Sequence, residues 1–308
     1  MDIVVPIIVG PTGIGKTCLS LILAENLPSE IISADSRQIY RYMDIGTAKA
    51  DLEYRQKIKH HMIDIYNPDE YFSAGMFAGK ARELIQNLIS NGKVPIVVGG
   101  SGFYISALID GIFEKQIFDI EIRNQLKYRA EKEGLDVLFG ELLQCDPEYA
   151  ERISANDRQR IFRSLEVYLV TGKPFSQWHK IGTTPAEFQY RLIGLNMERK
   201  NLYKRIEERV EKMVMNGLLD EVRHLQKLGY NAGLTSMKTV GYKEAFAFLK
   251  NEINHETMVT LIKQNTRRYA KRQLTWFRND KRIEWNNITS KADLERLGVM
   301  LSKVLFTS

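Results

Sequence analysis

Short apolar runs alternate with longer stretches of helical periodicity over the first hundred residues of the chain. The runs 4–9, 30–33 and 94–98 are rich in β-branched residues, which predicts buried strands. Apolar positions recur at helical spacing across 15–26 and 73–90. This alternation predicts an α/β fold with a parallel sheet flanked by helices.

The pattern changes between residues 118 and 187, where the chain becomes helical, charged and poor in strand-forming runs. We therefore predict a helical insertion domain at 118–187 that interrupts an α/β core made of 1–117 and 188–308. The core would resume with one strand and two long amphipathic helices, expected at 190–195, 200–228 and 256–278.

The composition, with 44% apolar and 27% charged residues among 308, is that of a folded soluble protein. Because no apolar run approaches the roughly 20 residues of a membrane helix and no secretory signal is evident, we expect a cytoplasmic monomer without a membrane partner. Cys18 and Cys145 lack the spacing of a disulfide framework or a zinc site. The adjacent His60 and His61 point to opposite faces of an extended segment, which favours a structural role over metal binding.

The sequence between the first strand and the first helix fits the pattern Gly-x-x-x-x-Gly-Lys-[Ser/Thr]. Its residues are Gly10, Pro11, Thr12, Gly13, Ile14, Gly15, Lys16 and Thr17. Backbone N–H groups of such a loop converge on an anion, so the sequence predicts a P-loop NTPase-like fold that binds a phosphate group. Lys16 would contact the phosphate oxygens, and the Thr17 hydroxyl would bind Mg²⁺. Taken alone, the loop is typical of enzymes that bind ATP.

P-loop proteins that hydrolyse nucleotides usually carry an acidic residue at the end of a later strand, but the strand at 94–98 runs into a glycine turn at 99–102. Either a ligand approaches this turn, with Ser101 as the polar contact, or packing alone requires the glycines. The carboxylate follows the second strand instead, at Asp35, where it could accept a proton or cap a helix. The residues beside it offer hydrogen bonds to a planar polar partner: Ser36, Arg37 and Gln38.

Basic residues concentrate in two segments. Between 263 and 282, eight residues are Lys or Arg and only Asp280 is acidic. Arg267 and Lys271 lie at i,i+4 spacing, which predicts a basic ridge against a phosphate backbone, with a solvated charged face as the alternative. A second cluster opens a predicted helix of the insertion and suits contacts with phosphates and bases: Arg158, Gln159, Arg160, Ile161, Phe162 and Arg163.

In this order, the motifs resemble those of the bacterial tRNA dimethylallyltransferases, also called tRNA isopentenyltransferases. The resemblance covers most of the chain and extends beyond the phosphate loop to 35–40, 44–49, 60–64, 98–102, 156–157, 160–163, 240–242 and 266–273. It implies transfer of a dimethylallyl group from dimethylallyl diphosphate to the exocyclic amine of the adenosine 3′ of the anticodon. Because this reaction hydrolyses no nucleotide, it needs no acid at the end of the 94–98 strand.

The resemblance also implies roles for individual residues. The loop, Lys16 and Mg²⁺ would hold the diphosphate leaving group, and Asp35 would accept the proton of the adenine amine. Ser101 matches a contact with the extruded nucleotide, and Arg205 matches an arginine near the diphosphate, with Arg209 as the alternative. By resemblance or by charge, the anticodon stem-loop of tRNA would contact Asp35, Ser36, Arg37, Gln38, Ser101, Arg123, Gln159, Arg160, Ile161, Phe162, Arg163, Arg267 and Lys271.

Three other functions are compatible with the sequence. An adenylate isopentenyltransferase shares the chemistry but uses a free nucleotide, whereas the insertion and the basic segment favour tRNA. The loop alone also fits a P-loop kinase of a small metabolite, or an RNA-binding protein that uses a nucleotide as a switch. Since no Cys or His follows His255, the resemblance points to the bacterial type, without the zinc finger of many eukaryotic relatives.

Overall fold

The computed structural model describes residues 3–112, 117–180 and 183–306. The chain forms two compact units, one of Met1–Leu108 with Ala186–Ser308 and the other of Ile109–Pro185. The first unit is the α/β core and the second is the helical insertion. The limits of the insertion differ from the predicted 118–187, because the composition changes only after the chain has left the core.

A single sheet of six parallel strands forms the core, in the order β3-β2-β4-β1-β5-β6. The strands are β1 (Val5–Val9), β2 (Ser29–Ser33), β3 (His60–His61), β4 (Val94–Gly99), β5 (Tyr190–Asn196) and β6 (Glu284–Asn287). Since β4 pairs with β1 on one side and β2 on the other, the carboxyl ends of these three strands are neighbours. The sheet confirms the α/β class predicted from the sequence.

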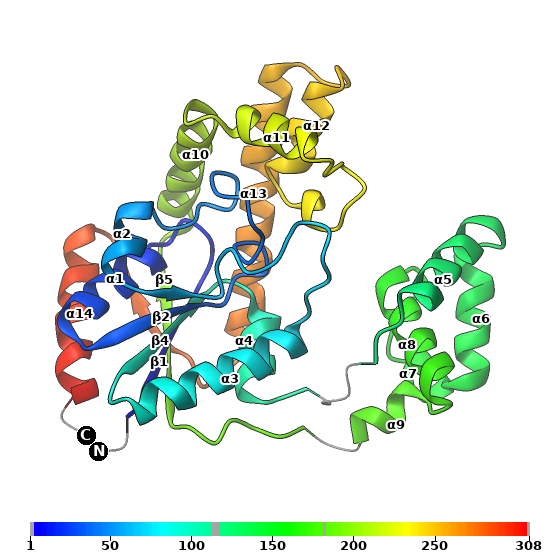
Figure 1. Cartoon of the computed structure of the whole chain (residues 1–308), viewed down its shortest axis with the longest axis horizontal. Coiled ribbons are helices and arrows are strands. Elements are labelled where there is room, and N and C mark those ends of the chain that lie inside the picture. Colours follow the sequence, from blue (N-terminus) through cyan, green and yellow to red (C-terminus); the bar gives the residue numbers. More distant parts are fainter. Residues whose placement is uncertain (1–2, 113–116, 181–182, 307–308) are drawn as a thin grey trace. The chain divides into compact units, whose positions relative to one another are not determined.

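Helices cover both faces of this sheet. Helices α1 (Lys16–Asn26) and α14 (Lys291–Phe306) pack on each other on one side, and α3 (Ala74–Ser90) lies on the other (Figure 1). Leu23 of α1 and Leu301 of α14 are buried in one apolar core with the sheet. Full burial of each such side chain contributes roughly 1.5–3 kcal/mol, so this core holds the strand ends in place.

The remaining helices of the core are α2 (Leu52–Lys57), α4 (Gly102–Ile109), α10 (Arg199–Met215), α11 (Leu218–Lys227), α12 (Tyr242–Leu249) and α13 (His255–Arg278). Helix α13 confirms the prediction for 256–278. The single helix predicted at 200–228 is wrong, because the chain breaks at Gly217 into α10 and α11. Gly217 has a φ of 97°, a conformation that residues with a Cβ rarely adopt.

The insertion is helical throughout its regular structure. It contains α5 (Ile120–Lys132), α6 (Leu135–Cys145), α7 (Pro147–Ala150), α8 (Arg158–Thr171) and α9 (Phe175–Lys180). Leu126, Leu142 and Ile161 belong to an apolar core of its own. Asp157 caps α8, since its carboxylate accepts a hydrogen bond from the Arg160 N–H at 3.1 Å.

Candidate active site

The phosphate loop joins β1 to α1, and its conformation follows from its glycines. Gly13 and Gly15 have φ values of 82° and 112°, which glycine adopts without the steric cost of a Cβ. A Cβ on Gly15 would also lie 2.8 Å from Cδ1 of Leu294 in α14. The turn ends where α1 begins at Lys16, so the unpaired N–H groups of the helix start lie at the loop.

The Lys16 side chain folds back over the loop. Its Nζ donates hydrogen bonds to the carbonyl oxygens of Gly10 at 3.0 Å and Pro11 at 2.9 Å. Burial lowers the pKa of Lys16 to about 8, while the Asp35 carboxylate raises it and the Arg209 guanidinium lowers it further. An anionic ligand would therefore stabilise the charged ammonium. Thr17, the next residue, is exposed.

Three strand ends bring the predicted site together. The glycine turn at 99–102 lies between the phosphate loop and Asp35, because β4 separates β1 from β2. A Cβ on the first of its glycines would lie 2.1 Å from the Ala34 carbonyl oxygen. Ser101 Oγ accepts a hydrogen bond from the Ser36 N–H at 3.0 Å. This carboxyl edge is where open α/β sheets bind ligands.

Asp35 lies in a turn and not at the start of a helix, so the helix-cap alternative is wrong. Its Oδ1 accepts a hydrogen bond from the Arg37 N–H at 2.8 Å. Two phenols face its charge from other helices: burial and the Asp35 carboxylate raise the pKa of Tyr104 and raise that of Tyr269 to about 12. Asp35 is thus a partly exposed carboxylate at the meeting point of several elements.

Arg205 and Arg209 lie one turn apart on α10 in different surroundings. Arg205 Nη1 donates to the carbonyl oxygen of Ile14 at 3.3 Å. Burial lowers the pKa of Arg209, and the Asp35 carboxylate partly offsets this effect. Arg209 therefore interacts electrostatically with both Asp35 and Lys16. The role of Arg205 at the diphosphate stays a prediction.

Gln38, predicted to contact tRNA, is engaged within the protein. Its Oε1 accepts from the Ser33 hydroxyl at 2.9 Å, and its Nε2 donates to the carbonyl oxygens of Thr47 at 3.3 Å and Ala48 at 3.2 Å. Arg37 donates to the carbonyl oxygen of Thr235 at 3.2 Å. The side chains beside Asp35 therefore also tie β2 to the segments that follow it.

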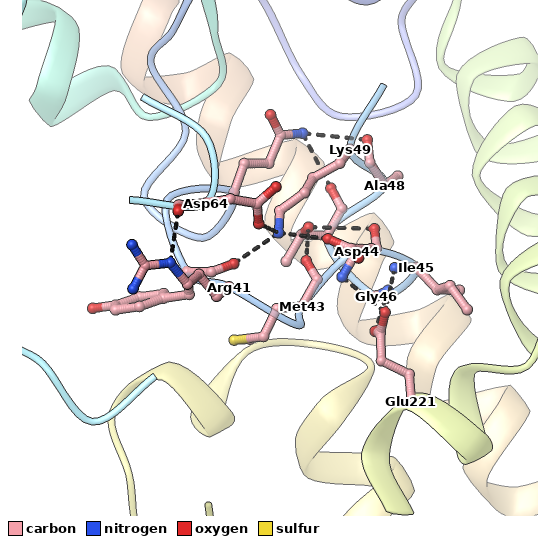
Figure 2. A network of polar contacts seen from close by, with 12 residues as sticks. Arg41, Met43, Asp44, Ile45, Gly46, Ala48, Lys49, Asp64 and Glu221 are labelled. Carbon is pink, nitrogen blue, oxygen red and sulfur yellow. Dashed lines mark hydrogen bonds and ion pairs between the residues drawn. The ribbon is translucent and has the colours of Figure 1, made fainter. Parts of the chain in front are cut away.

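Lys49 is the centre of a polar network beside the site, which the sequence showed only as part of a motif (Figure 2). Its side chain is 1% exposed. Its Nζ contacts Oδ1 of Asp44 at 2.6 Å, Oδ1 of Asp64 at 2.5 Å and the Tyr40 carbonyl oxygen at 2.7 Å. Arg55 pairs with the other oxygen of Asp64 at 2.6 Å. Opposite charges are matched within this network.

Glu221 of α11 holds the same segment from the other side, and sequence reasoning missed it. Its carboxylate accepts hydrogen bonds from three successive backbone N–H groups, those of Asp44, Ile45 and Gly46, at 2.8, 2.7 and 3.1 Å (Figure 2). It also accepts from the Tyr242 hydroxyl at 2.6 Å. The motifs 44–49 and 240–242 thus meet at one carboxylate.

The basic segment on α13 is less uniform than its sequence indicates. Arg267 pairs with Glu207 at 2.5 Å and Lys263 pairs with Glu211 at 2.6 Å, so acids of α10 neutralise part of the ridge. Lys271 is exposed and has no ion pair among the described residues. The prediction that acids are almost absent around this ridge is therefore wrong for Lys263 and Arg267, because their partners lie on α10, which is far away in sequence.

The insertion distributes its predicted tRNA contacts between surface and core. Gln159 and Arg160 are exposed, whereas Ile161 is 0% exposed and shielded by the apolar core. Arg123 forms a bidentate ion pair with the buried Glu166, from Nε to Oε1 at 2.9 Å and from Nη2 to Oε2 at 3.0 Å. Arg163 also pairs with Glu166, at 2.9 Å, and Phe162 is partly buried.

The histidine pair lies on the edge strand β3. His61 Nε2 contacts the carboxylate of Glu30 at 2.6 Å, and Lys93 pairs with the same carboxylate at 2.5 Å. Although burial opposes ionisation, these partners lower the pKa of Glu30 to about 2. Burial lowers the pKa of His60, whose Nδ1 contacts the Ile58 carbonyl oxygen at 2.7 Å. A groove of about 810 Å³ runs past this cluster.

No protein cage for a metal is evident in the described residues, which hold no group of three or more His, Cys, Asp or Glu that could bind one. In the ranges 3–112, 117–180 and 183–306, every helix is too short or too polar to cross a membrane.

The sheet and its phosphate loop define a P-loop-like α/β protein with a helical insertion. The sequence profile of the IPP transferase family matches residues 38–280. A tRNA dimethylallyltransferase of Thermotoga neapolitana is 44% identical over 292 residues, which are 94% of this chain and 95% of that protein. The chain belongs to this family of transferases.

Two solved structures agree with this assignment. The tRNA isopentenylpyrophosphate transferase of Bacillus halodurans superposes with a TM-score of 0.70 at 37% identity, over 99% of this chain and 97% of that one. A eukaryotic dimethylallyltransferase acting on tRNA gives a TM-score of 0.81 at 28% identity, over 94% of this chain and 75% of that one. The similarity therefore includes the whole architecture and not the phosphate loop alone.

Proposed function

We propose that this chain transfers a dimethylallyl group from dimethylallyl diphosphate to the exocyclic amine of the adenosine 3′ of the anticodon in tRNA. The observation that carries the proposal is the meeting of the phosphate loop, Ser101 and Asp35 at three adjacent strand ends. One side of this site suits an anionic leaving group and the other offers a proton acceptor. A single reaction that needs both is group transfer from a diphosphate to an amine.

The reaction breaks the bond between the allylic carbon and a diphosphate oxygen and forms a bond from that carbon to the adenine nitrogen. The electron pair of the broken bond leaves with diphosphate, where Lys16 and the loop N–H groups stabilise the developing charge. The amine nitrogen loses its proton to the Asp35 carboxylate as the new bond forms. The Arg209 guanidinium interacts electrostatically with the Asp35 carboxylate and adds positive charge to the site.

Thr17 and the phosphate loop fit a Mg²⁺ site of the kind that substrate phosphates complete. The Thr17 side chain is exposed at the start of α1, beside the residues that would hold diphosphate. Mg²⁺ commonly keeps several waters and takes only one or two protein ligands with phosphate oxygens. When bound, it would neutralise charge on the leaving diphosphate.

The test supplies radiolabelled dimethylallyl diphosphate and Mg²⁺ with unmodified tRNA, with AMP, or with neither acceptor. We expect label in tRNA alone, and nuclease digestion should place it on the adenosine 3′ of the anticodon. Label in AMP alone would establish the adenylate isopentenyltransferase alternative. If neither acceptor gains label and a parallel incubation with γ-labelled ATP transfers phosphate to a small molecule, the kinase alternative would be established.

Exposed cations on the insertion, together with Lys271 of α13, favour tRNA over a free nucleotide as the acceptor. Arg160 is 60% exposed in its side chain, and Lys271 is exposed on the core. A free nucleotide needs few such contacts outside the pocket, whereas a folded RNA brings a phosphate backbone to them. Truncating the insertion should therefore reduce transfer to tRNA while the core still binds dimethylallyl diphosphate.

A further inference from the structure

Gln273 of α13 is a buried polar residue that lies between the two halves of the site. The residue is 6% exposed. Its Oε1 accepts a hydrogen bond from the Thr12 N–H at 2.9 Å, and its Nε2 donates one to the Gly100 carbonyl oxygen at 2.8 Å. One amide therefore joins the phosphate loop after β1 to the glycine turn after β4.

The two ends of this bridge need opposite kinds of hydrogen-bonding group. The loop presents an N–H group, which needs an acceptor, and the turn presents a carbonyl oxygen, which needs a donor. A primary amide supplies both, whereas an ionised carboxylate only accepts. The contact is also close, because a Cβ on Gly100 would lie 2.3 Å from Nε2 of Gln273. A glycine at this position makes room for the bridge.

The bridge continues on both sides to groups with proposed roles. Thr12 belongs to the loop that would hold the diphosphate. Gly100 precedes Ser101, whose Oγ accepts from the Ser36 N–H at 3.0 Å beside Asp35. Gln273 is therefore the side chain that joins the diphosphate half of the site to the half that holds the adenine amine and its base.

We propose that Gln273 is a positioning residue that sets the spacing between the two substrates, an inference that rests on the proposed function. Displacement requires the amine nitrogen and the allylic carbon to lie about 3–3.5 Å apart and in line, and a shift of about 1 Å can cost about 10²-fold in rate. Each substrate binds to its own half of the site. Loss of the bridge should therefore lower kcat more than it weakens binding of either substrate alone.

The experiment compares Gln273→Glu and Gln273→Met with two control variants. Gln273→Glu keeps the acceptor for Thr12 but sets a carboxylate oxygen against the Gly100 carbonyl, and Gln273→Met removes both hydrogen bonds. Gln226→Glu makes the same chemical change at an exposed position of α11. Ile85→Ala removes a buried side chain of α3 and so controls for lost stability.

The measurements are kcat and KM for prenyl transfer, the Kd of each substrate alone, and the thermal unfolding midpoint. We expect both Gln273 variants to lower kcat at least about tenfold while each Kd changes by less than about threefold. Gln226→Glu should match the wild type. Ile85→Ala should lower the unfolding midpoint and keep its kcat well below that temperature, which shows that lost stability alone does not lower turnover.

The outcomes separate the two proposals. An active wild type with unchanged kcat in both Gln273 variants overturns the positioning role alone. The same holds if binding of dimethylallyl diphosphate is lost in parallel with kcat, or if Ile85→Ala lowers kcat as much at an equal loss of stability. A wild type that transfers no label overturns the proposed function, and the positioning role with it.

Discussion

Lys16 and Lys49 belong to the same α/β core and face different surroundings. Lys49 contacts two carboxylates and a carbonyl oxygen within 2.7 Å, and its side chain is 1% exposed. The Lys16 ammonium contacts two neutral carbonyl oxygens at 2.9 and 3.0 Å, and burial lowers its pKa to about 8. The charge of Lys49 is matched within the protein, whereas that of Lys16 is left for a ligand.

The other residues around Lys49 and those around Asp35 differ in the same way. Glu221 satisfies three backbone N–H groups and a phenol in the network around Lys49, which holds one segment in one conformation. Around Asp35, Arg209 contributes charge without a hydrogen bond or ion pair among the described residues. A polar network that is fully satisfied stabilises the fold, and one that is incomplete can bind a substrate.

The largest effect is expected at the candidate active site, for Asp35→Asn. The variant keeps the size of the side chain and loses the base, so turnover should fall roughly 10²- to 10⁴-fold. Binding of tRNA should stay within about threefold, because the carboxylate acts mainly as the new bond forms. Single-turnover transfer of label and filter binding of tRNA check the two parts. Unchanged turnover would remove Asp35 from the role of base.

Changes in the network around Lys49 should affect the stability of the fold. Lys49→Met leaves Asp44 and Asp64 without their shared cation. Because the side chains of these two acids are 52% and 34% exposed, the cost should lie between that of an exposed pair and that of a fully buried pair, at about 1–2 kcal/mol. Urea unfolding measures the loss. Lys57→Met is the matched control, since its pair with Glu53 is exposed on both sides and should contribute little to stability. If Lys49→Met were as stable as the control, the network would not be structural.

The pH dependence of substrate binding should test the assignment of Lys16. Because the pKa of Lys16 is lowered to about 8, its ammonium loses its proton as pH rises through that value, and attraction for the diphosphate weakens. The KM for dimethylallyl diphosphate should therefore rise about tenfold from pH 7 to pH 9. Lys16→Arg stays charged across this range, so its KM should be flat. A rise of the same size in Lys16→Arg would contradict the assignment.

The smallest effect is expected on α13, where Arg267 is paired and Lys271 is not. Neutralising Lys271 to Gln should make the dependence of log Kd for tRNA on log salt shallower by about one unit. Arg267→Gln should change this slope less, because Glu207 already neutralises its charge at 2.5 Å. Filter binding across a salt series measures both variants. Equal slopes in Lys271→Gln and the wild type would show that Lys271 belongs to a solvated charged face and does not contact tRNA.

The sequence predicted the elements whose signals are local. Buried β-branched runs gave three of the strands, the run at 190–195 gave a fourth, and apolar spacing gave α1, α3 and α13 within a few residues. The two-residue strand β3 and the short strand β6 carry too few residues for a periodic signal. The break at Gly217 was missed, because a glycine inside a helical pattern does not by itself show a positive φ.

The sequence by itself predicted a phosphate ligand for the loop and named Asp35 and Ser101, since these predictions depend on which residues follow which strand. Only the tertiary structure decided how charges are shared. It paired Arg267 with Glu207, brought Arg209 within electrostatic reach of Asp35, and placed Gln273 between the loop and the glycine turn. The physical reason is distance along the chain: these partners lie far apart in sequence, and only packing brings them together.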